Sequence, residues 1–167
     1  MISNEISSGI IVYRATSDGP KFLVLYHGKG YWNFPKGKLE KNERSFRAAV
    51  REVREETGLN YKDLRFKETF KAHDRFVFMR EGARVSKMVM FYLAETSNTR
   101  VRVSDEHEGY GWFLFSDAQR LMKHKNLRNI LKQAYDAICG TPSSSRVPRK
   151  YHKQFRRPSP RKLPIDL

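Results

Sequence analysis

The stretch Gly37-Lys-Leu-Glu-Lys-Asn-Glu43, followed after seven residues by Arg51-Glu-Val-Arg-Glu-Glu-Thr-Gly-Leu59, decides the fold. It predicts a helix from about Glu43 to Thr57. Gly37 is expected to permit a tight loop before the helix, and Gly58 to permit the left-handed conformation in which helices commonly end. The sequence therefore predicts a loop, a helix and a second loop in direct succession.

Three acidic residues of this helix, Glu52, Glu55 and Glu56, are spaced i, i+3 and i+4, so their carboxylates share one face. Like charges one turn apart repel, and helices seldom concentrate them unless a cation neutralises them. Oxygen ligands on a rigid element suit Mg²⁺ or Mn²⁺. Arg51, one turn before Glu55, is expected to hold that carboxylate in place. The alternative is an ordinary acidic face exposed to water.

A second face of the same helix has the periodicity of a buried stripe, centred about a third of a turn from the carboxylates. Its members are Phe46, Ala49, Val50, Val53 and Thr57. The helix is thus expected to be anchored on one side and to present acids on another.

Strands are expected on both sides of this helix, because short β-branched and aromatic runs alternate with turn residues. The predicted strands are Gly9–Tyr13, Phe22–Tyr26, Arg65–Ala72, Arg75–Met79, Lys87–Glu95, Arg100–Val103 and Tyr110–Phe115. A last helix is predicted from a capping box at Ser116 to Cys139, with a break around Lys123–Asn126. This order predicts an α/β class fold, an α/β/α sandwich around a mixed β-sheet.

The composition changes after Gly140. Residues 141–167 contain five prolines, eight Lys or Arg and a single acid. Such a segment cannot form a packed core, so we expect one domain over residues 1–140 and a basic, Pro-rich, flexible tail over 141–167. The net charge of +15 favours polyanionic partners and would attract substrates that carry phosphates.

Cellular location can also be predicted. No apolar run approaches the roughly 18 residues that a membrane span needs. Residues 1–13 lack the pattern of a secretory signal, and Cys139 is the single cysteine of the chain. We expect a cytoplasmic monomer without a membrane partner.

The pattern Gly, five residues, Glu, seven residues, Arg-Glu-aliphatic-x-Glu-Glu-x-Gly-aliphatic resembles the Nudix box, and Gly37–Leu59 meets each fixed position. The resemblance implies a hydrolase that binds divalent cations and activates water for attack on phosphorus. It implies that Glu52, Glu55 and Glu56 are metal ligands, one of which could serve as the base. Arg51 would take a supporting catalytic role. The fold of that family is also the α/β/α sandwich.

Two further segments, Trp32–Gly37 and Ser104–Trp112, resemble the asymmetric diadenosine tetraphosphate hydrolases, a likeness that extends over about residues 6–139. It implies that Glu106 is a further acid near the metals. The implied substrate-binding residues are Lys36 and Lys87 for the phosphate chain, and Tyr110 and Phe76 as aromatic candidates. The alternatives are exposed lysines, a loop acid and core aromatics. His107 is expected to be a structural hydrogen-bonding residue.

The expected activity is magnesium-dependent hydrolysis of diadenosine tetraphosphate to ATP and AMP. A second reading is an RNA 5′-end hydrolase or decapping enzyme, because Phe34–Lys38 also resembles the messenger-decapping Nudix enzymes and residues 141–167 could hold RNA. Hydrolysis of oxidised nucleoside triphosphates has no specific support. A Nudix-fold binding module without catalysis is disfavoured, since no glutamate of the box is missing. The stretch Arg80–Arg84 lengthens one connection relative to the tetraphosphatase pattern.

Overall fold

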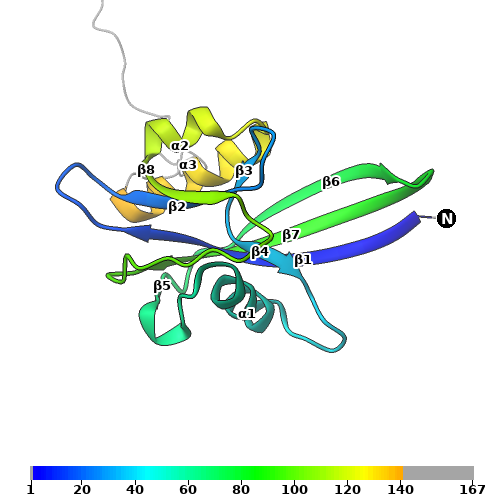
Figure 1. The fold of residues 1–167 in the computed structure, drawn as a ribbon, viewed down its shortest axis with the longest axis horizontal. Coiled ribbons are helices and arrows are strands. Elements are labelled where there is room, and N and C mark those ends of the chain that lie inside the picture. Colours follow the sequence, from blue (N-terminus) through cyan, green and yellow to red (C-terminus); the bar gives the residue numbers. More distant parts are fainter. Residues whose placement is uncertain (1, 141–167) are drawn as a thin grey trace, which may run out of the picture.

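The computed structural model describes residues 2–140, which form three layers (Figure 1). An eight-stranded sheet lies between α1 (Ser45–Thr57) on one face and α2 (Phe115–Leu121) with α3 (Lys125–Cys139) on the other. The predicted α/β/α sandwich is confirmed. Within residues 2–140, no helix is long and apolar enough to cross a membrane. The predicted tail, residues 141–167, lies outside the described residues.

The sheet is mixed and is built around β1. The strands are β1 (Ile2–Arg14), β2 (Lys21–Tyr26), β3 (Trp32–Asn33), β4 (Lys36–Lys38), β5 (Arg65–Phe66), β6 (Ala72–Arg80), β7 (Ala83–Glu95) and β8 (Gly109–Leu114). β1 pairs in parallel with β7 and antiparallel with β2 and β4. The order is β3-β2-β1-β7-β5, with β8 beside β2 and β6 beside β7.

The core lies on both faces of the sheet because β1 is apolar at successive positions. Ile10 and Val12 belong to a buried cluster that includes Ala49 of α1. Ile11 and Tyr13 belong to another, which includes side chains of α2 and α3. Since neighbouring side chains of a strand point to opposite faces, one apolar run anchors both helical layers.

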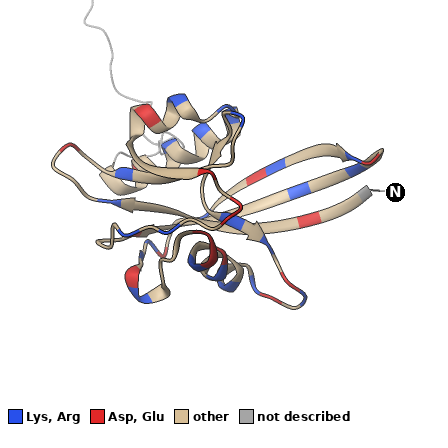
Figure 2. Ribbon diagram, viewed as in Figure 1, with Lys and Arg blue, Asp and Glu red and all other residues tan. Residues whose placement is uncertain are grey.

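The β6–β7 hairpin and the start of β1 project beyond the helices, and Figure 2 shows Lys and Arg along this part. Glu5 of β1 accepts a hydrogen bond from Lys38 Nζ at 2.9 Å and another from Arg80 Nη1. The bond from Arg80, and then that from Lys38, lower the pKa of Glu5 to about 2. Glu5 therefore links three strands through ion pairs.

One predicted strand is wrong. Residues 100–103 form a loop rather than a strand. The main-chain N–H of Arg102 donates to Thr57 O at 2.9 Å, at the end of α1. Val101 and Val103 still pack against the buried cluster beneath α1, which explains their alternation in the sequence.

The predicted strand over residues 65–72 is shorter than expected. Arg65–Phe66 and Ala72 pair with β7, but the chain between them turns, with Phe70 N–H donating to Lys67 O at 3.0 Å. A short 3-10 turn, η1 (Tyr61–Asp63), connects α1 to this strand.

The predicted capping box at Ser116 is not formed. α2 already begins at Phe115, and its N-cap has no side-chain hydrogen bond. The amide of Gln119, the fourth residue of the expected box, instead donates to Arg128 O at 2.6 Å. The predicted break between the last two helices is confirmed, since α2 ends at Leu121 and α3 begins at Lys125.

Candidate active site

Arg51 contacts the carboxylates of Glu52 and Glu55 on α1 and that of Glu43 just before this helix. Its Nε and Nη2 each donate to one oxygen of Glu43 at 2.9 Å. Its Nη1 donates to Glu52 Oε1 at 2.8 Å and to Glu55 Oε2 at 3.2 Å, and Nη2 also donates to Lys38 O at 2.9 Å. The hydrogen bonds from Arg51 hold the pKa of Glu43 below its usual range. The contact with Glu55 is the one that the one-turn spacing predicts.

Glu56 is the most buried acid of the cluster, with 7% of its surface exposed. Its Oε2 accepts a hydrogen bond from the main-chain N–H of Lys36 at 2.8 Å. Burial raises the pKa of Glu56 to about 8. The charges of Glu52 and Glu106 raise this pKa as well, whereas Lys36 lowers it. His107 Nε2 lies 3.5 Å from Glu56 Oε1. Burial lowers the pKa of His107, so this contact is not an ion pair at neutral pH.

The glycines that flank α1 serve two different purposes. Gly58 is the C-cap, with a φ of 75°, as the sequence predicts. Gly37 lies in β4 and has no positive φ, but a Cβ at this position would be 1.9 Å from the carboxyl carbon of Glu52. Gly37 is therefore needed for the close approach of Glu52, and its expected role in a tight turn is wrong.

The donor set fits a hard divalent cation in its chemistry. All four candidate ligands, Glu52, Glu55, Glu56 and Glu106, offer carboxylate oxygens, the kind that Mg²⁺ and Mn²⁺ prefer. Burial also raises the pKa of Glu52, and a bound cation would relieve this cost of placing anions together. Within residues 2–140, no three acidic, His or Cys side chains already converge as a metal site, and Arg51 occupies oxygens of Glu52 and Glu55 instead.

A groove of about 520 Å³ adjoins the carboxylates through Lys36. Lys36, Lys87 and Phe76, three of the predicted substrate-binding residues, all line it. Burial lowers the pKa of both lysines, and the charge of Lys36 lowers that of Lys87 further. Lys87 Nζ has one carboxylate at the limit of ion pairing, Glu5 Oε2 at 3.9 Å. Two partly buried ammonium groups that repel each other favour an anionic ligand.

Several residues that line the groove were not predicted. They are Tyr31, Asn33, Asp74, His124 and Asn126. Asp74 is buried and accepts a hydrogen bond from Asn126 Nδ2 at 2.9 Å, which joins β6 to the first turn of α3. The tyrosine could have been noticed beside the Trp32 motif. Nothing in the sequence distinguishes Asn126 or His124 from ordinary helix-end residues.

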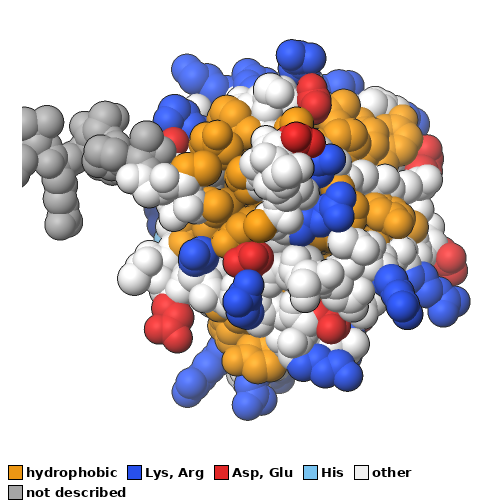
Figure 3. Space-filling model, turned by 90° about the vertical axis from the view of Figure 1, so that its left-hand side faces the viewer, with side chains coloured by type: hydrophobic (Ala, Val, Ile, Leu, Met, Phe, Trp, Pro, Cys, Tyr) orange, Lys and Arg blue, Asp and Glu red, His pale blue; other side chains and the backbone are white. Residues whose placement is uncertain are grey.

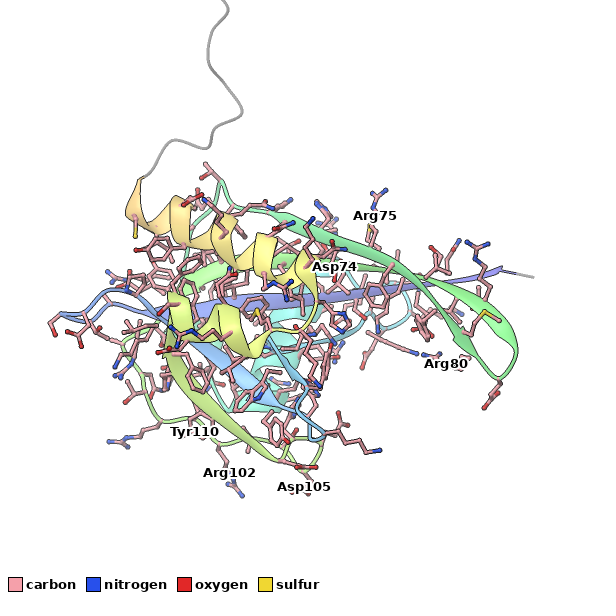
Figure 4. The ribbon with its side chains drawn as sticks, turned by 90° about the horizontal axis from the view of Figure 1, so that it is seen from above. Asp74, Arg75, Arg80, Arg102, Asp105 and Tyr110 are labelled. Carbon is pink, nitrogen blue, oxygen red and sulfur yellow. The ribbon has the colours of Figure 1, made fainter. Side chains whose placement is uncertain are left out.

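Tyr110 does not line this groove. It lies on β8 opposite Leu25, with 42% of its surface exposed. Figure 4 shows it on the side of the molecule that carries Arg102 and Asp105, away from Asp74. Glu106, by contrast, is close enough for its charge to affect both Glu52 and Glu56. The structure thus places the other predicted site residues in the carboxylate cluster or along the adjoining groove, and Tyr110 elsewhere. The roles of all of them stay predictions.

Known proteins are similar to this chain in sequence and fold. The NUDIX domain matches residues 4–134. A protein of Mus musculus named bis(5′-nucleosyl)-tetraphosphatase (asymmetrical) is 32% identical over 145 residues, covering 81% of this chain and 96% of the relative. A Rattus norvegicus protein of the same name is 29% identical, with the same coverage. The crystal structure of a C. elegans Ap4A hydrolase binary complex matches with a TM-score of 0.71 and 25% identity, covering 81% of this chain and 98% of that chain. The chain therefore belongs to the Nudix hydrolase family and is homologous to the bis(5′-nucleosyl)-tetraphosphatases.

Proposed function

We propose that the chain is a magnesium-dependent pyrophosphohydrolase that splits diadenosine tetraphosphate asymmetrically into ATP and AMP. The observation that carries this proposal is the position of Lys36. Its main-chain N–H holds Glu56, while its side chain lines the groove together with Lys87 and Phe76. A phosphate chain beside the carboxylates would thus continue into a groove with aromatic walls. The mouse and rat relatives are named bis(5′-nucleosyl)-tetraphosphatase, which supports this substrate class, and their names include the word asymmetrical, which supports this mode of cleavage.

The carboxylates would hold the metal. Glu52, Glu55, Glu56 and Glu106 are the proposed ligands, for Mg²⁺ or alternatively Mn²⁺. When bound, such a cation lowers the pKa of water and offsets charge on the phosphates. Arg51 would hold Glu52 and Glu55 in place, because one guanidinium donates to several acceptors in a rigid fork.

The groove would hold the substrate. The ammonium groups of Lys36 and Lys87 would pair with phosphate oxygens. The carboxylate beside Lys87, that of Glu5, lies 3.9 Å away and leaves this ammonium group able to bind an anion. The rings of Phe76 and Tyr31 offer flat apolar surface to one base. A dinucleotide has a second base, for which the exposed ring of Tyr110 remains a candidate.

A comparison of kcat/KM tests the proposal. Diadenosine tetraphosphate, triphosphate-ended RNA and capped RNA are offered separately to the full chain with Mg²⁺, with Mn²⁺ and with a chelator, and the products are separated by ion-pair chromatography. Fastest turnover of the dinucleotide to ATP plus AMP is expected, and none with the chelator. Formation of two ADP would contradict asymmetric cleavage. A preference for either RNA would make the chain an RNA-end hydrolase.

A further inference from the structure

Aromatic rings gather on the outer surface of α1 and the following turn. Phe46, Tyr61 and Phe66 form what we call the α1 platform. The ring of Tyr61 stacks on Phe66 with centroids 5.8 Å apart, and Phe46 meets Phe66 edge-on at 4.9 Å. Tyr61 is nevertheless 60% exposed. The platform therefore offers an open aromatic face to a ligand.

Core packing explains only part of the platform. Phe66 packs against the buried cluster beneath α1, and Phe46 meets the buried Tyr92 at 5.2 Å. These two rings belong to a small extension of the core. Tyr61 lies on top of them and exposes most of its surface, so the core does not account for an aromatic residue at this position.

Cations surround the platform on two adjoining hollows, which share Phe46 and Tyr61. Arg47, Arg54 and Lys62 line one hollow, and Lys67 and Lys71 line the other. All five are exposed, and within residues 2–140 none of them has a carboxylate oxygen within 4.0 Å.

Acids contribute little to the same hollows. Glu43 lines the first but is already bonded by Arg51, and Glu68 lines the second. On the face shown in Figure 3, hydrophobic side chains at the lower end, where Figure 1 places α1 and η1, are flanked by Lys and Arg. The surface thus combines positive charge with aromatic rings.

We propose that the α1 platform and its cations bind single-stranded nucleic acid. A single strand presents what this surface can use, namely phosphates for unpaired cations and unstacked bases for an exposed ring. A duplex hides its base faces and would use only the charges. No residue is shared between these hollows and the groove of Lys36, so the proposal does not depend on the substrate proposed above.

Fluorescence anisotropy with the full chain tests this binding. The probe is a single-stranded RNA of about 12 nucleotides with a 5′-hydroxyl end, which offers no anhydride to hydrolyse. R54A/K62A removes two platform cations, and R120A/K132A removes two exposed cations from α2 and α3 on the other face of the sheet. Y61A removes the open ring, and Y61F keeps it. Residues 141–167 are present in every variant and cancel in the comparison.

The platform variants should lose affinity selectively. R54A/K62A should make the slope of log K against log salt shallower by about 1.4, at about 0.7 for each lost phosphate contact, and R120A/K132A should not. Y61A should bind at least about fivefold more weakly than Y61F, as loss of one base stack predicts. R54A/K62A and Y61A should retain diadenosine tetraphosphate turnover and the thermal midpoint of the wild type. These two measurements show that the variants fold.

Three results would overturn the proposal. Equal losses in the two cation pairs would indicate only general basicity. Unchanged affinity in Y61A would exclude stacking, and a duplex of the same sequence that binds as tightly as the single strand would exclude recognition of bases. Single-stranded DNA forms a further arm, in which a preference for either sugar supports the proposal and identifies the strand.

Discussion

At Arg51 a single side chain makes a cluster of acids compatible with a folded helix. Each carboxylate one turn from another raises the free energy of the helix, and burial adds to that cost for Glu52 and Glu56. Arg51 offsets part of it by donating to Glu52 and Glu55, and it takes its own position from Glu43. Glu56 does not contact Arg51 and instead accepts a hydrogen bond from the main-chain N–H of Lys36. The remaining anionic character is what a divalent cation would neutralise.

Gly37→Ala tests the close approach at this cluster. The added Cβ would overlap the carboxylate of Glu52 and force the end of this side chain to move, so we expect a weaker affinity for Mg²⁺ and a smaller effect on the free energy of unfolding. Gly109→Ala is the matched control, since a Cβ there meets nothing within 4 Å and the residue has no positive φ. Urea denaturation and Mg²⁺ titration of turnover measure both effects. Equal behaviour of the two variants would contradict the role assigned to Gly37.

Glu56→Gln tests the proposed metal ligand. Burial already raises the pKa of Glu56 to about 8, so the neutral amide resembles a form that the fold tolerates, and the thermal midpoint should stay unchanged. Turnover should nearly vanish, because an amide is a much poorer ligand for Mg²⁺ than a carboxylate. The exposed Glu68→Gln is the control and should retain full activity. Near-normal turnover by E56Q would remove Glu56 from the metal site.

Among the elements, α1 could be predicted closely because its signals agree. The apolar stripe, the acidic face and Gly58 all indicate the same helix, which begins at Ser45 rather than Glu43. Within the stripe, Ala49, Val53 and Thr57 are buried as predicted, whereas Phe46 is exposed and Val50 only partly buried. Each of these signals comes from residues within a few turns of one another. Where local patterns agree in this way, the sequence alone is sufficient.

Other elements depend on distant partners and could not be predicted. The alternation of Val101 and Val103 indicates a strand, but its main chain bonds to the end of α1 through Arg102 and Ser104 instead of joining the sheet. At the last helix pair, α3 recruits Gln119 away from the expected capping box. In both cases a hydrogen bond to a distant segment replaces the bond that the pattern suggests.

Glu5 allows a pH test at the level of the strands. Folding lowers the pKa of Glu5 from 4.5 to about 2, because Arg80 and Lys38 stabilise its charged form. The contribution of these ion pairs to the free energy of unfolding is therefore fully present above pH 4.5 and is lost as the pH falls toward 2. Wild type should therefore be more stable than E5Q at pH 7, and the difference should shrink between pH 4.5 and 2.5. Thermal unfolding across this range measures it, with Glu81→Gln at the tip of the hairpin as the control. A difference that does not change with pH would contradict these ion pairs.

The residues that line the groove come from elements far apart in the chain, so only some of them could be predicted from the sequence. Lys36, Lys87 and Phe76 were predicted singly, yet only the topology places β4, β6 and β7 around one space. Asp74 and His124 come from the base of the hairpin and the break before α3, which no local pattern connects. The same topology places Tyr110 elsewhere, so a residue that is close to Glu106 in sequence need not line the groove.

The net charge of +15 is divided between residues 1–140 and residues 141–167, and the latter carry eight Lys or Arg against one acid. Deleting residues 141–167 should change kcat/KM for diadenosine tetraphosphate by less than about twofold at physiological salt, because the carboxylate cluster and the lining of the groove lie within residues 2–140 and salt weakens the steering of substrate by net charge. It should weaken RNA binding at low salt, where those cations still act. Parallel kinetic and anisotropy measurements at several salt concentrations separate the two effects. Unchanged RNA affinity would dismiss the tail as a nucleic-acid contact, whereas a large fall in dinucleotide turnover would mean that the tail contributes to the active site itself.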